Sequence, residues 1–220
     1  MSDETQTQEY LDLAALPAVP TEEDHVEVDP NADPYAGPPP PNDGEHLVKV
    51  TYGSDDPVKR WQKRTDKRNG TIYYATSIIS RVIAPQNEDD NKAVFDNFVS
   101  TQMYRGTSKV IGLISALRGD VTQISSHLDQ VRILDELLRG EPTCGLETYW
   151  ESQHNTGEKD DRGKDIWKTV MDPVTRRPYR GQENFPRKPD GTFEHIVHSP
   201  VDGSDCPAQA RAKRYFRPGY

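Results

Sequence analysis

Cysteines and long apolar stretches are scarce in this chain, and their scarcity excludes several classes of protein. Two cysteines among 220 residues are too few for the disulfide framework of a small secreted domain. No run of 18 apolar residues is present, so no segment is expected to cross a membrane. The N-terminus lacks the basic and apolar regions of a secretory signal peptide. We therefore expect a protein of a reducing cytoplasm that does not contact a membrane.

Lysine and arginine are absent from the first 46 positions, which contain twelve acidic residues. The remaining 174 residues contain 24 acidic residues and 27 lysines and arginines. The net charge of -9 is therefore the sum of about -12 on residues 1–46 and about +3 on residues 47–220. Eight prolines lie between Pro17 and Pro41, and such a segment buries too little apolar surface to offset the entropy of ordering it. We predict a disordered, acidic, proline-rich tail over residues 1–46 and a folded domain over residues 47–220. The tail is interpreted either as a solubilising segment or as one that docks a partner or mimics a polyanion.

Motifs for phosphate cradles and nucleophile elbows are also absent, since the sequence has no GxxxxGK[ST], GxGxxG or GxSxG. Two carboxylate pairs, Asp89-Asp90 and Asp160-Asp161, fall in polar turn-like stretches and are interpreted as solvated loop charge. Side chains of the types that bind zinc lack the close pairs of structural zinc sites. These side chains are Cys144, His154, His195, His198 and Cys206. We expect no metal, no cofactor and no enzymatic activity, with a metal-dependent nuclease as the least favoured alternative.

The periodicity of apolar residues predicts an α+β protein. Strands are indicated where apolar and polar residues alternate or where β-branched and aromatic residues gather. The predicted strands cover residues 47–52, 71–83, 93–99, 143–150, 166–171, 193–198 and 208–216. Two helices are predicted where apolar residues recur every three or four positions, one capped by Thr107 or Ser108 and ended by Gly119, the other over residues 121–138. Residues 155–163 and 172–191 are expected to form long, charged hairpin loops.

A basic run over residues 59–68 carries the strongest functional signal, with six cations and one tryptophan in ten residues. Lysine and arginine neutralise phosphates, and an exposed indole stacks on a base without demanding a sequence. Trp61 is expected on the surface, because a core tryptophan would be unusual among these cations. Tyr73 and Tyr74 follow on opposite faces of the predicted strand, so at most one is expected to face the same groove as the cations.

A second basic cluster closes the chain, where the alternation over residues 210–213 predicts a strand with one cationic face. The two clusters together predict a nucleic-acid interface. The predicted binding residues are Lys59, Arg60, Trp61, Lys63, Arg64, Lys67, Arg68, Tyr73, Tyr74, Arg211 and Lys213. The alternative interpretation of the same residues is a solvated charged surface above core aromatic side chains.

Residues 47–216 resemble the phage-encoded single-stranded-DNA-binding proteins with an OB-like barrel. The resemblance lies in the order of LVKVTY, the basic hairpin KRWQKRTDKRNG, the long strand TIYYATSIISRVI, AVFDNFVST, the helix TSKVIGLISALRG and the returning strand CGLETYWESQ. It implies an OB-like β-barrel, here with a two-helix insertion, that binds single-stranded DNA without catalysis in phage DNA replication or recombination in the host cytoplasm. It also implies that the acidic tail recruits replication proteins and competes with DNA. The alternative is a phage virion structural or assembly protein whose acidic arm docks a neighbouring subunit.

Overall fold

The computed structural model describes residues 39–66, 70–100, 109–119, 126–161 and 163–219. The predicted disordered tail lies outside these ranges up to residue 38. Its last part, residues 39–46, belongs to the folded body, because strand β1 already begins at Gly44. The described helices include none that is long and apolar enough to cross a membrane.

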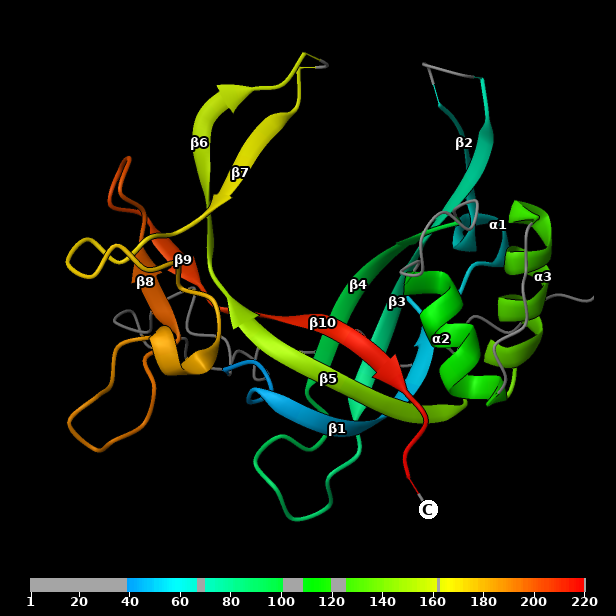
Figure 1. Cartoon of the computed structure of the whole chain (residues 1–220), viewed down its shortest axis with the longest axis horizontal. Coiled ribbons are helices and arrows are strands. Elements are labelled where there is room, and N and C mark those ends of the chain that lie inside the picture. Colours follow the sequence, from blue (N-terminus) through cyan, green and yellow to red (C-terminus); the bar gives the residue numbers. More distant parts are fainter. Residues whose placement is uncertain (1–38, 67–69, 101–108, 120–125, 162, 220) are drawn as a thin grey trace, which may run out of the picture. The chain divides into compact units, whose positions relative to one another are not determined.

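Six antiparallel strands form the main sheet (Figure 1). These are β1 (Gly44–Tyr52), β2 (Gln62–Thr65), β3 (Ile72–Val82), β4 (Ala93–Val99), β5 (Thr143–Glu151) and β10 (Gln209–Phe216). Their order is β10-β5-β1-β3-β2, and β4 pairs with the other edge of β3. The predicted α+β class is confirmed. Strand pairing in the described part of the chain does not close the sheet into a barrel.

Strand β3 organises the sheet because it is long enough to pair with three others. It pairs with β1 along Ile78–Val82, with β2 along Ile72–Ala75, and with β4 along Ala75–Arg81. Its β-branched and aromatic residues suit a pleated strand. Successive side chains point to opposite faces, so Ile78, Ser80 and Val82 are buried while the residues between them face outward.

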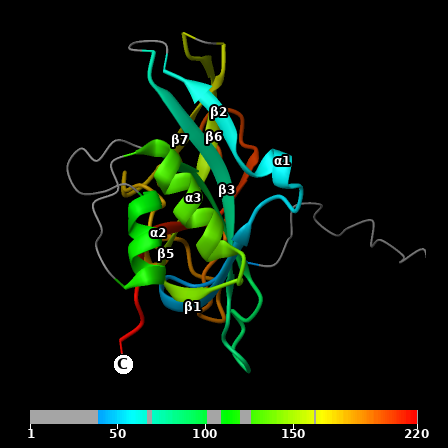
Figure 2. The same cartoon turned by 90° about the vertical axis from the view of Figure 1, so that its right-hand side faces the viewer.

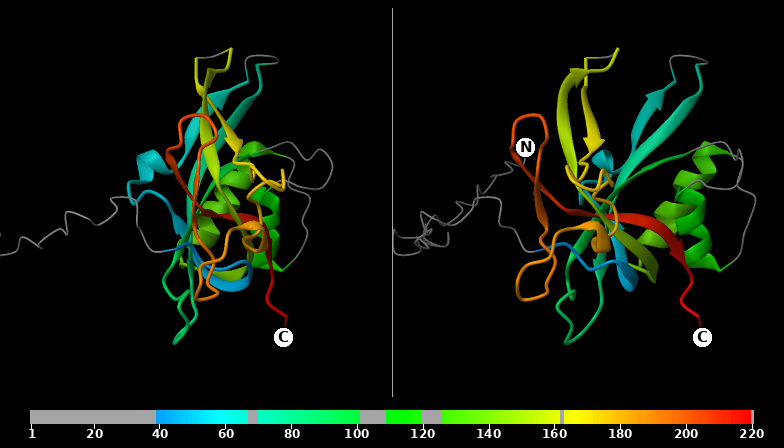
Figure 3. Two further views of the ribbon diagram at one scale, coloured as in Figure 1. Left: turned by 90° about the vertical axis from the view of Figure 1, so that its left-hand side faces the viewer. Right: turned by 60° about the vertical axis from the view of Figure 1, so that its left-hand side comes forward.

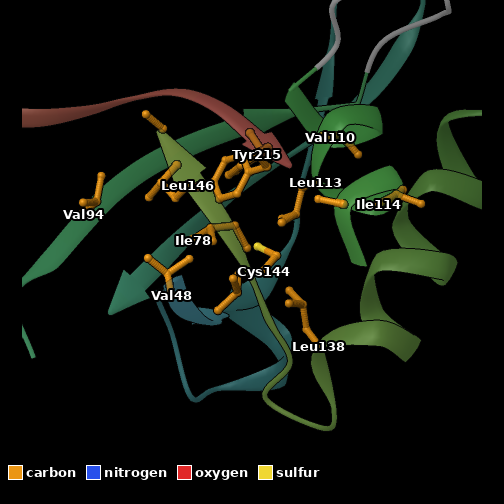
Figure 4. Close-up of a cluster of buried hydrophobic side chains, with 14 of the residues drawn as sticks. Val48, Ile78, Val94, Val110, Leu113, Ile114, Leu138, Cys144, Leu146 and Tyr215 are labelled. Atoms are coloured by element: carbon orange, nitrogen blue, oxygen red, sulfur yellow. The ribbon is translucent and has the colours of Figure 1, made fainter. Parts of the chain in front are cut away.

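Helices α2 (Lys109–Arg118) and α3 (His127–Leu138) lie side by side against the sheet (Figure 2). In α2, Val110, Leu113 and Ile114 follow helical spacing and point into a core shared with β1, β3 and β5 (Figure 4). Gly119 ends α2 with a φ of 79°, which suits glycine. Ser126 caps α3 by accepting a hydrogen bond from the Asp129 backbone N–H. The first part of the predicted second helix, residues 121–125, and the predicted caps Thr107 and Ser108 lie outside the described residues.

The chain between β5 and β10 forms a second hydrophobic cluster around Trp150 and carries two hairpins. Its elements are β6 (Gln153–Lys159), β7 (Asp165–Thr169), the 3-10 helix η3 (Gln182–Asn184), β8 (Ile196–His198) and β9 (Asp205–Pro207). The prediction of a loop over residues 155–163 is wrong, because β6 covers most of that stretch and pairs with β7. The β6 sequence QHNTGEK has no β-branched alternation that would have marked it as a strand.

Residues 40–43, the strap, connect three parts of the body ahead of β1. The Trp150 indole Nε1 donates to the carbonyl of Pro41 at 2.7 Å, and Trp150 itself is buried. The Asp43 carboxylate accepts the backbone N–H groups of Trp150 and Gln182, both at 2.6 Å. The backbone N–H of Asn42 donates to Asp89. The strap therefore satisfies polar groups of β5, η3 and the β3–β4 loop at once.

Candidate nucleic-acid interface

The predicted basic run forms the short helix α1 (Pro57–Arg60), strand β2 and part of the turn to β3. In the β2–β3 hairpin, Arg64 lies opposite Tyr73 and Lys63 lies opposite Tyr74. Because directly paired residues share a face, each face of the hairpin presents one cation and one tyrosine. Lys67 and Arg68 lie outside the described residues. The expectation that Tyr73 and Tyr74 face opposite ways is confirmed.

One face of this hairpin opens into a cavity of about 580 Å³, here named the hairpin cavity. It is lined by Gly53, Ser54, Lys59, Arg60, Gln62, Arg64, Tyr73, Ala75, Thr76, Ser77, Asn97, Phe98 and Val99. Three predicted cations and one predicted aromatic residue therefore meet in one place. No carboxylate occurs among the described residues that line it. Lys59 forms an ion pair with Asp56 at 3.3 Å, so Arg60 and Arg64 supply most of the positive charge of the cavity. Such a cavity favours an anion that also presents an apolar surface.

The outward face of β3 and β4 continues from this cavity and was not identified from the sequence. Phe95 is 65 % exposed there, beside its cross-strand partner Ile79, and Val99 is also exposed. Arg81 lies further along β3 on the same face and is exposed, with no ion-pair partner in the described structure. An exposed phenylalanine beside a cation provides a platform on which a base can stack.

A second hollow of about 500 Å³ shares Gly53, Ser54 and Arg60 with the hairpin cavity. It brings Arg81 and Arg139 to the same side of the molecule. It also contains carboxylates, those of Asp55 and Glu141, and Glu141 forms an ion pair with Lys49. The hairpin cavity is therefore the more favourable of the two for a phosphate.

Trp61 is half-buried and packs against the main core, contrary to the expectation of a surface position. Its indole lies edge-on to Tyr52, with ring centroids 6.3 Å apart, and its Nε1 donates to the Tyr52 hydroxyl at 3.1 Å. That hydroxyl donates in turn to Asp135 of α3 at 2.9 Å. Burial, assisted by the Asp135 carboxylate, raises the pKa of Tyr52, so its hydroxyl stays protonated and keeps this bond. The base-stacking role of Trp61 stays a prediction.

Replacing Trp61 with Ala is expected to lower the free energy of unfolding by about 2 kcal/mol. The substitution removes an aromatic packing contact and leaves the partly buried Tyr52 hydroxyl with one donor fewer. Trp61→Phe should retain most of the packing and lose only the hydrogen bond. Urea denaturation of the two variants measures the difference. A Trp61→Ala protein as stable as the parent would show that the contact with Tyr52 contributes nothing.

The second predicted cluster lies on β10, as expected, and its cations point to one face. These cations are already paired with carboxylates of the neighbouring strands. Arg211 contacts the buried Glu151, while Lys213 and Arg214 both contact Glu147 at 2.6 and 2.5 Å. Hydrogen bonds from these two cations lower the pKa of Glu147, which keeps it ionised. Arg211 and Lys213 therefore do not line the hairpin cavity, and carboxylates of β5 neutralise their charge.

The β6–β7 hairpin supplies a further exposed aromatic residue that the sequence analysis missed. Trp167 is 57 % exposed on β7, opposite Asn155 of β6. The β6–β7 and β2–β3 hairpins extend in the same direction from the main sheet (Figures 1 and 3). A tryptophan on an extended hairpin is available for stacking or for a protein partner.

The residues considered as metal ligands do not gather. Groups of three or more His, Cys, Asp or Glu side chains able to hold a metal are absent from the described ranges. Cys144 is buried in the main core and Cys206 in the second cluster. The interpretation of Asp89-Asp90 as solvated charge is wrong for Asp89, which is buried and forms an ion pair with Lys92 at 2.9 Å. Asp160 and Asp161 are exposed in the β6–β7 turn, as predicted.

Comparisons of the chain with protein-family models, with curated proteins and with solved structures gave no match.

Proposed function

We propose that this protein binds single-stranded DNA without catalysis, through the hairpin cavity and the outward face of β3 and β4. The observation that carries the proposal is the composition of this surface. Lys59, Arg60 and Arg64 meet Tyr73 in a cavity whose described lining contains no carboxylate, and Phe95 extends the surface. Cations that track a backbone, together with aromatic side chains that stack on bases, are the usual features of a single-strand site.

We further propose that the sheet is a variant of the OB fold. Five strands, β1, β3, β4, β5 and β10, follow one another with the helices between the third and the fourth. Strands β10 and β4 also approach each other, since the rings of Tyr215 and Phe98 lie 5.7 Å apart. OB folds bind oligonucleotides on the face of their second and third strands and with the loops that precede the second and fifth strands. Here those elements are β3 and β4, the β2–β3 hairpin and the segment that contains β6 and β7.

Under this proposal the protein acts in phage DNA replication or recombination in the host cytoplasm, and its acidic tail recruits replication proteins. A fluorescence titration with poly-dT at 50 and 200 mM salt tests the binding itself. Neutralising Z phosphates of a single strand gives a slope of log K against log salt near -0.7Z, so six contacts give about -4. Absence of salt-dependent binding would refute the proposal and favour a virion assembly protein.

A further inference from the structure

The carboxamide groups in the hairpin cavity have their oxygen atoms occupied and their N–H groups available. Arg64 Nη2 donates to Gln62 Oε1 at 2.9 Å. A guanidinium only donates, so this contact fixes which end of the Gln62 carboxamide is the oxygen. Ser77 Oγ donates to Asn97 Oδ1, also at 2.9 Å. Among the described residues, the side-chain hydrogen bonds of Gln62 and Asn97 use only the oxygen atoms, which leaves Gln62 Nε2 and Asn97 Nδ2 available.

The cavity around these amides is suited to one base of a bound strand. Its volume of about 580 Å³ lies in the range of small-molecule pockets, roughly 300–1,000 Å³. Tyr73, Ala75 and Val99 supply apolar wall, and Lys59 and Arg64 supply charge for the phosphate. A base held there meets four N–H donors from the two amides and no carboxylate from the described lining.

We propose that this cavity discriminates between bases by their exocyclic group, favouring a carbonyl oxygen over an amine. Thymine and guanine offer a carbonyl that the Gln62 and Asn97 N–H groups can reach. The comparison is made at C4 of a pyrimidine and C6 of a purine, where cytosine and adenine carry an amine. An amine that faces the amide N–H groups places donor against donor and leaves both groups without an acceptor. This inference rests on the proposed function. The inference adds base selectivity to that function, because stacking and phosphate contacts alone distinguish bases only weakly.

Binding of dT15 and dC15 by the full chain provides the test, since both ligands are pyrimidines and differ in this group. We expect dT15 to bind about 10-fold more tightly, the lower part of the range for a good base contact. Asn97→Asp replaces the NH2 group with an oxygen of similar size. It should bring the ratio of the two affinities to about one or invert it, because a carboxylate accepts from the cytosine amine. Gln209→Glu, an equal charge change at an exposed position of β10, should leave the ratio unchanged.

A modified oligonucleotide tests the same inference on the parent protein, so the result does not depend on whether a variant folds. An oligomer of the 2-pyrimidinone nucleotide lacks the 4-oxygen of thymine, so it should bind the parent protein about as weakly as dC15 does. Equal affinities for dT15 and dC15 in the parent, or a preference that persists in both Asn97→Asp and the double variant Gln62→Ala/Asn97→Ala, would overturn the inference. Binding of neither oligomer would instead refute the proposed function, and the inference with it.

Discussion

Replacing Lys63, Arg64, Lys67 and Arg68 with Ala should weaken binding of poly-dT by about 100-fold at 50 mM salt. Each cation that neutralises a phosphate releases counterions, and the slope of log K against log salt changes by about 0.7 per contact on a single strand. Losing up to four contacts should therefore make the slope less steep by up to about 3. The part of the loss that comes from phosphate contacts should be similar on every sequence, because phosphates carry no sequence information.

The structure supplies a matched control for the overall change of charge. Arg132, Arg176, Arg177 and Lys188 are exposed and lie outside the hairpin cavity, and replacing all four with Ala removes the same charge. This control should keep the parent's slope to within about one contact. Lys63 and Arg64 are also exposed and form no ion pair in the described structure, so their removal should leave the thermal midpoint unchanged. A quadruple variant that binds as the parent does would exclude the β2–β3 hairpin as the site.

Strands with clear alternation were predictable from the sequence. The segments LVKVTY, TIYYATSIISRVI and AVFDNFV became β1, β3 and β4 with boundaries shifted by at most three residues. Which face each would bury was harder to predict, because β4 contains Phe95 and Phe98 on opposite faces. Phe98 is buried and Phe95 exposed, and only the pairing with β3 decides between them. The exposed platform was therefore missed.

Errors arose where a distant partner determines the environment of a residue. Trp61 sits among cations in the sequence, yet its indole packs against Tyr52 and donates to the Tyr52 hydroxyl, which donates in turn to Asp135. Asp89 is buried because Asn42, 47 residues earlier, donates to it and Lys92 pairs with it. Local composition carries no signal for either contact. The cations of β10 were placed correctly on one face, but their neutralisation by Glu147 and Glu151 depends on strand order.

The contacts of the strap could not be predicted from local composition either. They determine where the N-terminal tail can be removed without damage to the folded body. Composition placed the end of the tail at residue 46, inside β1. A protein lacking residues 1–46 loses Pro41, Asn42 and Asp43 together with three residues of β1 that pair with β5. The buried indole and backbone N–H of Trp150, and the backbone N–H of Gln182, then have no acceptor in the body. An unsatisfied buried donor costs about 1–3 kcal/mol.

We therefore expect deletion of residues 1–46 to lower the thermal midpoint by about 10 °C or more, or to prevent folding. Three lost bonds amount to about 5 kcal/mol, a large share of the stability of an ordinary domain. Asp43→Ala should reproduce part of this loss in the full chain. Glu45 lies just after the strap and forms an exposed ion pair with Arg214. Glu45→Ala should therefore change the free energy of unfolding by less than about 1 kcal/mol. Equal effects of the two substitutions would show that the strap does not stabilise the body.

Deletion of residues 1–38 should leave the thermal midpoint unchanged and tighten binding of single-stranded DNA at low salt. This deletion keeps the strap but removes ten acidic residues and no lysine or arginine. A tethered segment of that charge stays near the cationic cavity at high effective concentration and competes with phosphates. The competition is electrostatic, so it should be strong at 20 mM salt and vanish well above 0.1 M, where the Debye length falls below about 10 Å. Titrations of the parent and the shortened chain with poly-dT at both salts measure it, and equal affinities at 20 mM would leave the tail as a solubilising or docking segment.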